Sequence, residues 1–332
     1  MRRVSVEIPG RPYPVLIGEG AGEAAAEFLT GTCVVVADSS LAELPGIDAA
    51  VVRVPGGEAA KSFRVVEEIV AGLAAARLGR DGTVVAVGGG TIGDVAGFAA
   101  SVWQRGVALI QVPTTLLAMV DSAIGGKTGI NTAGAKNAVG SFWQPRAVLI
   151  DPRYLRTLPE EHLQGGQAEV LKYAMILDPG IADLDLGEEM IERCVSCKAR
   201  VVADDERDSG RREILNYGHT VAHALESESG YRLHHGRAVA AGMRAAARIS
   251  ASLGLCDPVL VEIQDRLLAA RGLPGLLPSL GLDSVLSRLQ TDKKVRDGRL
   301  RWVLLRRMGS AEAGHEAPSA TVREAVAEIL SA

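Results

Sequence analysis

The stretch VVAVGGGTIGDVAGF (residues 84–98) decides the fold of the N-terminal half. An apolar run enters it, three glycines turn the chain, and an amphipathic run leaves it. Gly88, Gly90 and Gly93 match the G-x-G-x-x-G pattern of dinucleotide-binding turns, in which a strand leads to a phosphate at a helix N-terminus. The turn does not follow the first strand, however, and no acidic residue stands about 20 residues further on. The pattern alone is compatible both with a nucleotide-binding turn and with a purely structural glycine-rich corner. If the site combines non-adjacent βα units, Asp38 could serve as its acidic residue at the carboxyl end of a strand.

The first half of the chain alternates β-branched runs with helical ones. The run 58–79 has apolar residues at helical spacing and ends at Gly79, and the first 18 residues favour two short strands. Further strands are predicted at 33–37, 49–54, 83–87, 108–112 and 147–151. Strands that alternate with helices predict parallel βαβ units covered on both faces.

From about residue 160 the pattern becomes helical, and β-branched runs almost vanish until 299–307. Helices are predicted over 160–187, 188–203, 215–228 and 238–253. We therefore expect an α/β N-terminal dinucleotide-binding domain over residues 1–155 and a mostly α-helical C-terminal domain over residues 156–332.

The composition excludes several classes of protein. The chain has 332 residues, 47% of them hydrophobic but only 4% aromatic, and a net charge of −4, which argues against nucleic-acid binding. There is no signal-peptide core and no apolar run long enough for a membrane helix. The four cysteines include one C-x-x-C, Cys194 and Cys197, without the second pair that a four-thiolate zinc site needs. We expect a cytoplasmic protein with no membrane partner.

Residues 112–145 combine glycines with polar side chains. Asp121, Lys127, Lys136 and Asn137 stand among four glycines, on what we expect to be loops. Lysines on glycine-rich loops suit an anionic, phosphorylated substrate. The spacing is not that of a Walker P-loop, so an NTPase is not predicted.

Histidines gather in ILNYGHTVAHALE (214–226) and LHHG (233–236). His219 and His223 are four residues apart, so they share one helix face at metal-ligand spacing. Thr220 stands where a zinc protease would carry its glutamate, which excludes that class. Spacing alone predicts a metal held by His219 and His223.

Taken together and in order, these motifs resemble the 3-dehydroquinate synthase family of sugar-phosphate cyclases. The resemblance runs from about Val35 to Gly309 and includes seven motifs: GGGTIGDVAGF, QVPTTLLAMVDSAIGGKTGIN, AKN, QAEVLKY, ILNYGHT, HG at 235–236 and DKK at 292–294. It implies an NAD- and zinc-dependent (or cobalt-dependent) phosphate-eliminating cyclase, a carbon–oxygen lyase. The implied substrate, 3-deoxy-D-arabino-heptulosonate 7-phosphate, is oxidised at C5, loses phosphate by β-elimination, is reduced again and closes by an intramolecular aldol addition to 3-dehydroquinate.

The resemblance also assigns roles to individual residues. The metal ligands fall on Glu169, His219 and His235, so that His223 becomes a substrate contact. The cofactor site comprises Asp38, Glu58, Lys61, Gly88, Gly89, Gly90, Asp94, Thr114, Thr115 and Thr157. The catalytic set is Asp121, Lys127, Lys172, Asn216 and His223. The substrate contacts are Arg105, Lys136, Asn137, Lys198, Arg212, Lys293 and Lys294, with Lys198 and Arg212 on the C1 carboxylate and Arg105 reaching a neighbouring subunit of a homodimer.

Two departures keep alternatives open. Arg237 follows the metal ligand and glycine where the family often has an acid or a small residue, and the segment between Lys172 and Lys198 is short for the family. The nearest alternative is aminodehydroquinate synthase. Cyclases of sedoheptulose 7-phosphate or glucose 6-phosphate would not need Lys198 and Arg212. An iron-dependent alcohol dehydrogenase would lack the phosphate contacts, and a non-catalytic ligand-binding derivative would have lost site residues.

Overall fold

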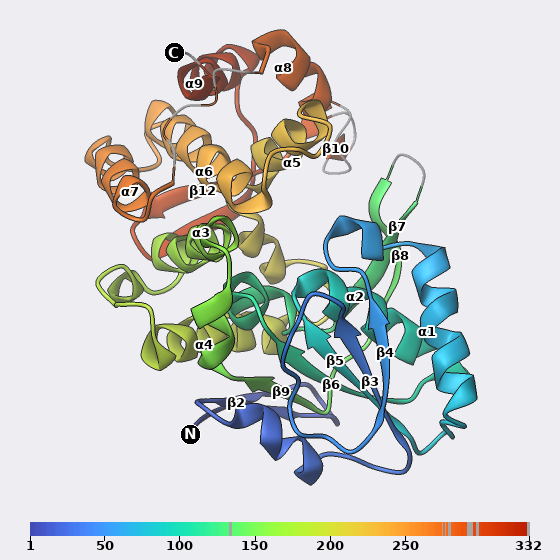
Figure 1. Ribbon diagram of the computed structural model, residues 1–332. Helices are drawn as coiled ribbons and strands as arrows, with labels where there is room; N and C mark the ends of the chain where they lie inside the picture. The colour runs from blue at the N-terminus through green and yellow to red at the C-terminus, as the bar shows by residue number, and fades with distance from the viewer. Residues whose placement is uncertain are drawn as a thin grey trace. The chain divides into compact units, whose positions relative to one another are not determined.

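The computed structural model describes residues 1–132, 135–273, 275, 277, 280–290, 295–296 and 299–330. These residues form two compact units, shown in Figure 1. One unit consists of Met1–Pro159 and Leu186–Arg207, and the other of Glu160–Asp185 and Asp208–Ala332.

The first unit is built on a seven-stranded sheet with the order β1-β2-β9-β6-β5-β3-β4. All neighbouring strands are parallel except the antiparallel pair β1 and β2. The strands are β1 (Arg2–Val6), β2 (Tyr13–Ile17), β3 (Cys33–Asp38), β4 (Ala50–Val54), β5 (Thr83–Gly88), β6 (Ala108–Pro113) and β9 (Ala147–Ile150). All seven strands expected in this region are therefore present, and the predicted α/β class is confirmed.

Both faces of this sheet are buried. In β3, Val34 and Val36 pack in the apolar cluster that includes the covering helices, whereas Val35 and Ala37 pack in a second cluster on the other face. The second face is covered in part by the short 3₁₀ helix Ala21–Glu27. Parallel strands buried on both faces read as continuous apolar runs, which explains why CVVVA predicted its strand.

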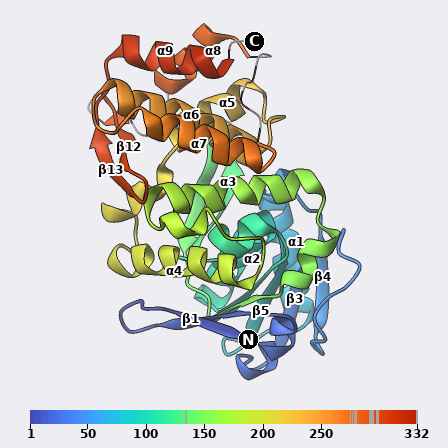
Figure 2. The ribbon, with the colours of Figure 1, turned by 90° about the vertical axis from the view of Figure 1, so that its left-hand side faces the viewer.

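Two helices cover the first face, as Figure 2 shows. Helix α1 (Phe63–Ala75) begins at Ser62, whose hydroxyl accepts a hydrogen bond from Val65 N, and it buries apolar residues three and four positions apart. Helix α2 (Gly90–Val102) follows β5 directly, and among the described residues no side chain caps its first turn. The N–H groups at that end are thus available for an external acceptor.

The glycine-rich segment predicted as loops is instead an antiparallel hairpin of β7 (Lys127–Thr132) and β8 (Ala135–Phe142). Gly129 pairs with Gly140 in its register. A Cβ on Gly129 would lie 2.7 Å from Val139 O, and one on Gly140 would lie 2.1 Å from Thr128 O. The glycines therefore permit close strand approach rather than supplying loop flexibility.

Helix α4 (Glu188–Asp204) belongs to the first unit, although it lies far along the sequence. It contacts β1 and the π-helical turn Ala118–Ser122. The chain passes between the units after residues 159, 185 and 207, so the predicted division at residue 155 lies near the first of these points.

The second unit is mainly helical, as predicted. Its helices are α3 (Glu160–Ile176), α5 (His219–Glu228), α6 (His235–Ser252), α7 (Val259–Ala270), α8 (Leu282–Gln290) and α9 (Ser319–Leu330). The run predicted as a strand at 299–307 contains β11 (Arg299–Leu300) and β12 (Trp302–Arg307); β11 pairs with β10 (Val295–Arg296), and β12 with β13 (Ser310–His315). No helix in the described ranges is long and apolar enough to cross a membrane.

Four helices differ from prediction. In the first unit, α1 spans Phe63–Ala75 instead of 58–79, and Glu58–Ala60 form a separate 3₁₀ helix. Helix α3 ends at Ile176 rather than near 187 because Pro179 disfavours helical backbone in the residue before it. Helix α5 begins at His219 rather than at 215, since Gly218 has a φ of 79° and residues Arg211–Asn216 form a 3₁₀ helix. Helix α6 begins at His235, three residues before the predicted start.

Glycines let the helices of this unit approach closely. A Cβ on Gly242 of α6 would lie 2.0 Å from Gly218 O, and one on Gly236 would lie 2.2 Å from Gly165 Cα in α3. The start of α5 therefore packs against the middle of α6, and the first turn of α6 packs against α3.

Candidate active site and metal centre

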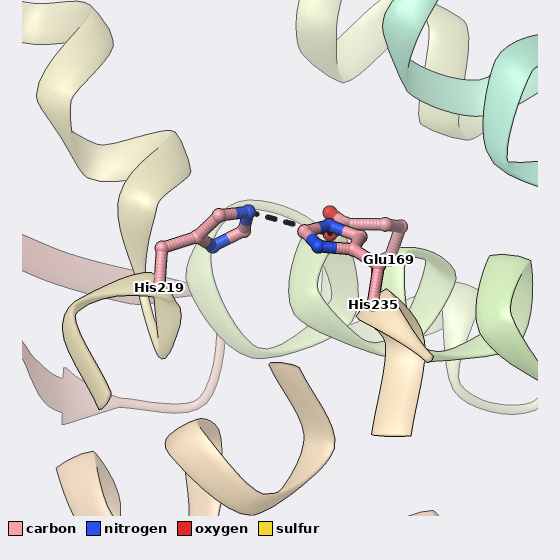
Figure 3. A group of neighbouring side chains, drawn as sticks. All are labelled: Glu169, His219 and His235. Carbon is pink, nitrogen blue, oxygen red and sulfur yellow. Dashed lines mark ion pairs between the residues drawn. The ribbon is translucent and has the colours of Figure 1, made fainter. Parts of the chain in front are cut away.

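Glu169, His219 and His235 form one cluster in the second unit. Glu169 lies in the middle of α3, and the two histidines open α5 and α6. Figure 3 shows the three side chains pointing toward one another from these helices. His219 Nε2 lies 3.5 Å and His235 Nε2 lies 3.4 Å from the same oxygen, Glu169 Oε1.

This geometry fits a transition-metal ion. Each residue offers one ligand atom, and the three atoms lie within 4.8 Å of one another. Tetrahedral zinc with bonds of about 2.0–2.1 Å places its ligand atoms about 3.3 Å apart, close to the two distances from Glu169 Oε1. Two imidazoles and a carboxylate leave coordination positions open, which is typical of catalytic rather than structural zinc.

Lys172 fixes the ligand carboxylate from its other side. Its Nζ forms an ion pair with Glu169 Oε2, one helical turn away in α3. Glu169 is 0% and Lys172 is 1% exposed, so the pair is removed from water. A carboxylate held at one oxygen presents the other oxygen to the imidazoles, which favours a single metal–oxygen bond.

The two histidines differ in their electrostatic surroundings. Burial lowers the pKa of His219 well below its usual value, although Glu169 opposes this. Burial also lowers the pKa of His235, but hydrogen bonds to Glu169 and Glu226 outweigh it and raise the pKa to about 10. A cation would thus replace the proton that His235 carries between two carboxylates.

Spacing alone paired His219 with His223 as metal ligands. His219 belongs to the cluster, whereas the other two members come from α3 and α6 rather than from the same helix face. The His223 ring lies 5.8 Å from the His219 ring, and its side chain is exposed. His223 is therefore placed beside the cluster. Arg237, in the first turn of α6, has a buried Nε with no hydrogen-bond partner among the described atoms.

The glycine turn lies in the first unit at the carboxyl end of β5, between β3 and β6. Thr114 N donates to Gly88 O over 2.9 Å, and Thr115 Oγ1 accepts from Ala118 N. A Cβ on Gly89 would lie 3.1 Å from Thr115 Cγ2. Asp38 ends β3, the strand beside β5, so residues from non-adjacent βα units meet at this edge.

Side chains in front of the turn are tightly spaced. A Cβ on Gly90 would lie 2.5 Å from Ser122 Oγ, a buried atom with no hydrogen-bond partner among the described residues. A side chain at position 89 or 90 would therefore be crowded by Thr115 or Ser122, which explains why both residues are glycine. Sequence reasoning missed Ser122, whose only signal is its position directly after Asp121.

Lys61 is the centre of a polar network in the first unit. It is 5% exposed, its Nζ donates to Asp94 Oδ2 over 2.5 Å, and it also donates to Asn137 Oδ1. Burial raises the pKa of Asp94, while Lys61 acts against that shift. The network extends through Asn131, which donates to Glu58 Oε2 and accepts from Asn137 N. Sequence reasoning missed Asn131 because it lies in a segment that was predicted as loops.

Buried Lys198 and half-buried Asp121 form a second ion pair. Lys198 Nζ donates to Asp121 Oδ1 over 2.5 Å and to Asp121 O over 2.7 Å. Lys198 comes from α4 and Asp121 from the π-helical turn, so the pair depends on α4 joining the first unit. π-Helical turns are rare and occur frequently at functional sites.

The remaining predicted residues are scattered or lie elsewhere. Lys127 at the start of β7, Arg105 and Thr157 are exposed, and Lys136 Nζ lies 3.9 Å from Glu58 Oε1. In the second unit, Arg212 is buried and Asn216 half-buried, both in the 3₁₀ helix Arg211–Asn216. Lys293 and Lys294 lie outside the described residues.

Comparisons with known proteins identify the family of the chain. Two adjoining family models match the chain: 3-dehydroquinate synthase N-terminal over residues 51–165 and 3-dehydroquinate synthase C-terminal over residues 166–295. A 3-dehydroquinate synthase from Nostoc punctiforme is 45% identical over 296 residues, which cover 84% of this chain and 82% of the relative.

Solved structures of related cyclases have the same fold. A 2-deoxy-scyllo-inosose synthase complexed with carbaglucose-6-phosphate, NAD⁺ and Co²⁺ matches with a TM-score of 0.88 and 26% identity, over 98% of this chain and 99% of that chain. A 2-epi-5-epi-valiolone synthase from Streptomyces hygroscopicus with NAD⁺ and Zn²⁺ bound matches with a TM-score of 0.86 and 27% identity, over 95% of each chain. Because the family models together span residues 51–295 and a relative at 45% identity covers most of the sequence, the chain belongs to the 3-dehydroquinate synthase family.

Proposed function

We propose that this chain converts 3-deoxy-D-arabino-heptulosonate 7-phosphate to 3-dehydroquinate and phosphate, with NAD and a divalent metal. The observation that carries the proposal is the cluster of Glu169, His219 and His235, which offers three ligands from three helices in a chain of this family. The relatives named 3-dehydroquinate synthase favour this substrate over its amino analogue.

Glu169, His219 and His235 would hold zinc or cobalt, the metals bound by the two related structures. Such an ion supplies Lewis acidity to a substrate hydroxyl. Lys172 holds the Glu169 carboxylate in place, and His223 lies beside His219, where its exposed ring would contact substrate. Asn216, three residues before His219, adds a polar contact next to the same cluster.

NAD would bind at the glycine turn, where it supplies a transient hydride acceptor. The uncapped first turn of α2 offers N–H groups to the pyrophosphate, and Gly88, Gly89 and Gly90 leave the backbone accessible. The side chains that would complete the cofactor site are Asp38, Glu58, Lys61, Asp94, Thr114, Thr115 and Thr157. Lys61 orders this set, since it joins Asp94 to the β7–β8 hairpin through Asn137.

The substrate is a dianionic phosphate ester with a carboxylate, and the chain offers cations for both groups. Lys198, held by Asp121, and Arg212 are the proposed carboxylate contacts, and both are buried. Lys127, Lys136, Asn137, His223, Arg105 and the two lysines at 293–294 are the proposed phosphate contacts.

We further propose that the protein acts in the cytoplasm as a homodimer in which Arg105 of one subunit reaches the phosphate in the other. Arg105 is exposed and has a φ of 69°, a conformation that a side chain rarely adopts without a local requirement. The four cysteines are free thiols, as expected in a reducing compartment. Sedimentation of the purified protein, with a dimer expected and a monomer contradicting it, tests the assembly.

The test of the reaction is phosphate release from a panel of substrates at saturating NAD and zinc. We expect rapid release from 3-deoxy-D-arabino-heptulosonate 7-phosphate, and at least about 100-fold lower kcat/KM with sedoheptulose 7-phosphate, because that substrate lacks the carboxylate that Lys198 and Arg212 are proposed to bind. Faster release from the amino analogue than from the oxygen substrate would overturn the substrate assignment.

A further inference from the structure

Both imidazoles of the metal cluster are held at their second ring nitrogen. His219 Nδ1 lies 3.1 Å from the backbone oxygen of Tyr217, two residues before it. His235 Nδ1 lies 3.5 Å from Glu226 Oε1. A carbonyl or carboxylate oxygen only accepts hydrogen bonds, so Nδ1 of each ring is the donor to this outer partner, and Nε2 is the nitrogen that would bind a metal ion beside Glu169.

The two groups that accept from the Nδ1 atoms differ in charge. The Tyr217 carbonyl is neutral, whereas Glu226 is a carboxylate and is only 4% exposed. Glu226 lies seven residues after His219 in α5, so both stand on the same face of that helix. Helix α5 therefore provides one metal ligand directly and the partner of a second ligand that belongs to α6.

Burial of Glu226 needs a reason. A carboxylate removed from water is costly unless it is paired, and His235 Nδ1 is a partner at ion-pair distance. Glu226 is not itself in the ligand group, because it faces the ring nitrogen of His235 that points away from Glu169. Its position thus matches that of an outer partner of a metal-bound histidine.

We propose that Glu226 is a positioning residue that fixes the ring orientation and tautomer of His235 and strengthens it as a metal ligand. The proposal rests on the metal site of the proposed function. Outer carboxylates of this kind orient the imidazole and raise its basicity, and their loss lowers metal affinity by about 10- to 100-fold.

The experiment compares zinc affinity in Glu226→Gln, Glu226→Ala and the parent, by competition with a chromophoric chelator. Glu228→Gln is the matched control, because it removes the same charge two residues away on α5, where Glu228 pairs only with Arg288 at 3.3 Å in the described structure. We expect about a tenfold loss for Glu226→Gln, which keeps an acceptor, up to 100-fold for Glu226→Ala, and no change for Glu228→Gln.

The visible absorption of the cobalt-substituted proteins is a second readout, which a purely structural role would leave unchanged. We expect the d–d bands to shift in Glu226→Gln, whose metal-free form should retain the circular dichroism of the parent. Parent-like zinc affinity and cobalt spectra in Glu226→Gln would overturn the positioning role while leaving the proposed function intact. Failure of the parent to bind zinc would contradict both.

Discussion

Replacement of Gly236 by alanine should separate two helices that carry metal ligands. The new Cβ would lie 2.2 Å from Gly165 Cα and 2.5 Å from Gly165 O. Carbon atoms in contact are about 3.5–4.0 Å apart, so α6 must move from α3 by at least about 1.3 Å. Because Gly236 follows His235 directly and Gly165 lies one turn before Glu169, the shift falls on the distance of 3.4 Å between His235 Nε2 and Glu169 Oε1.

Metal–ligand bonds tolerate deviations of only about 0.2 Å, so a shift of this size removes His235 as an effective ligand. We expect Gly236→Ala to lower zinc affinity by at least about 100-fold, more than the loss of an outer partner. Overpacking should also cost about 1–3 kcal/mol of unfolding free energy. Zinc competition and denaturant unfolding of the metal-free protein measure the two effects separately.

The reciprocal substitution is the matched control. A Cβ on Gly165 would meet only Gly236 N, at 3.9 Å, an ordinary contact distance. Gly165→Ala should therefore keep parent-like zinc affinity and gain up to about 1 kcal/mol from helix propensity. Equal zinc affinity in Gly236→Ala and Gly165→Ala would refute the argument that this glycine contact sets the ligand geometry.

Three further predictions concern the first unit. Lys61→Met should weaken NAD binding about tenfold or more, because it removes a charged hydrogen bond worth about 1.5–3 kcal/mol and takes the lysine away from the half-buried Asp94; parent-like affinity by calorimetry would contradict this. Lys198→Met should lower kcat/KM at least about 30-fold, equivalent to about 2 kcal/mol, and a change below threefold would argue against its substrate role. Burial opposes ionisation of Asp151, but hydrogen bonds from Arg153 and Gly20 outweigh this effect and lower the pKa of Asp151. Its ionised form therefore stabilises the fold at pH values above the unfolded-state pKa of about 3.9. This contribution is lost as pH falls through the lower pKa of the folded state. Asp151→Asn should therefore cost about 1–3 kcal/mol at pH 7 in urea unfolding and progressively less below pH 4, and a cost independent of pH would be the contrary result.

Sequence periodicity predicted the central sheet well, since β-branched runs such as 33–37 are buried on both faces and have no other stable placement. The hairpin of β7 and β8 was missed because its glycines resemble loop residues. Their function is the close approach of Gly129 and Gly140, which depends on pairing between segments. The membership of α4 in the first unit is likewise a tertiary contact that composition does not encode.

The metal cluster, too, depends on tertiary contacts that sequence periodicity does not report. Spacing within one helix identified His219 but paired it with His223, because periodicity reports neighbours on one helix only. Glu169 and His235 come from two other helices, and only the family motifs indicated them. Glu226 followed from neither, since its significance is its distance to His235 Nδ1.

The central claim is tested most directly by following 3-deoxy-D-arabino-heptulosonate 7-phosphate turnover with NAD at one-hundredth of the substrate concentration, with zinc or with a chelator. We predict that phosphate and 3-dehydroquinate form in equal amounts to completion, with no net NADH, and that the chelator or His235→Ala stops the reaction. Turnover that ends after one equivalent of NAD, or that continues in metal-free His235→Ala protein, would contradict the account.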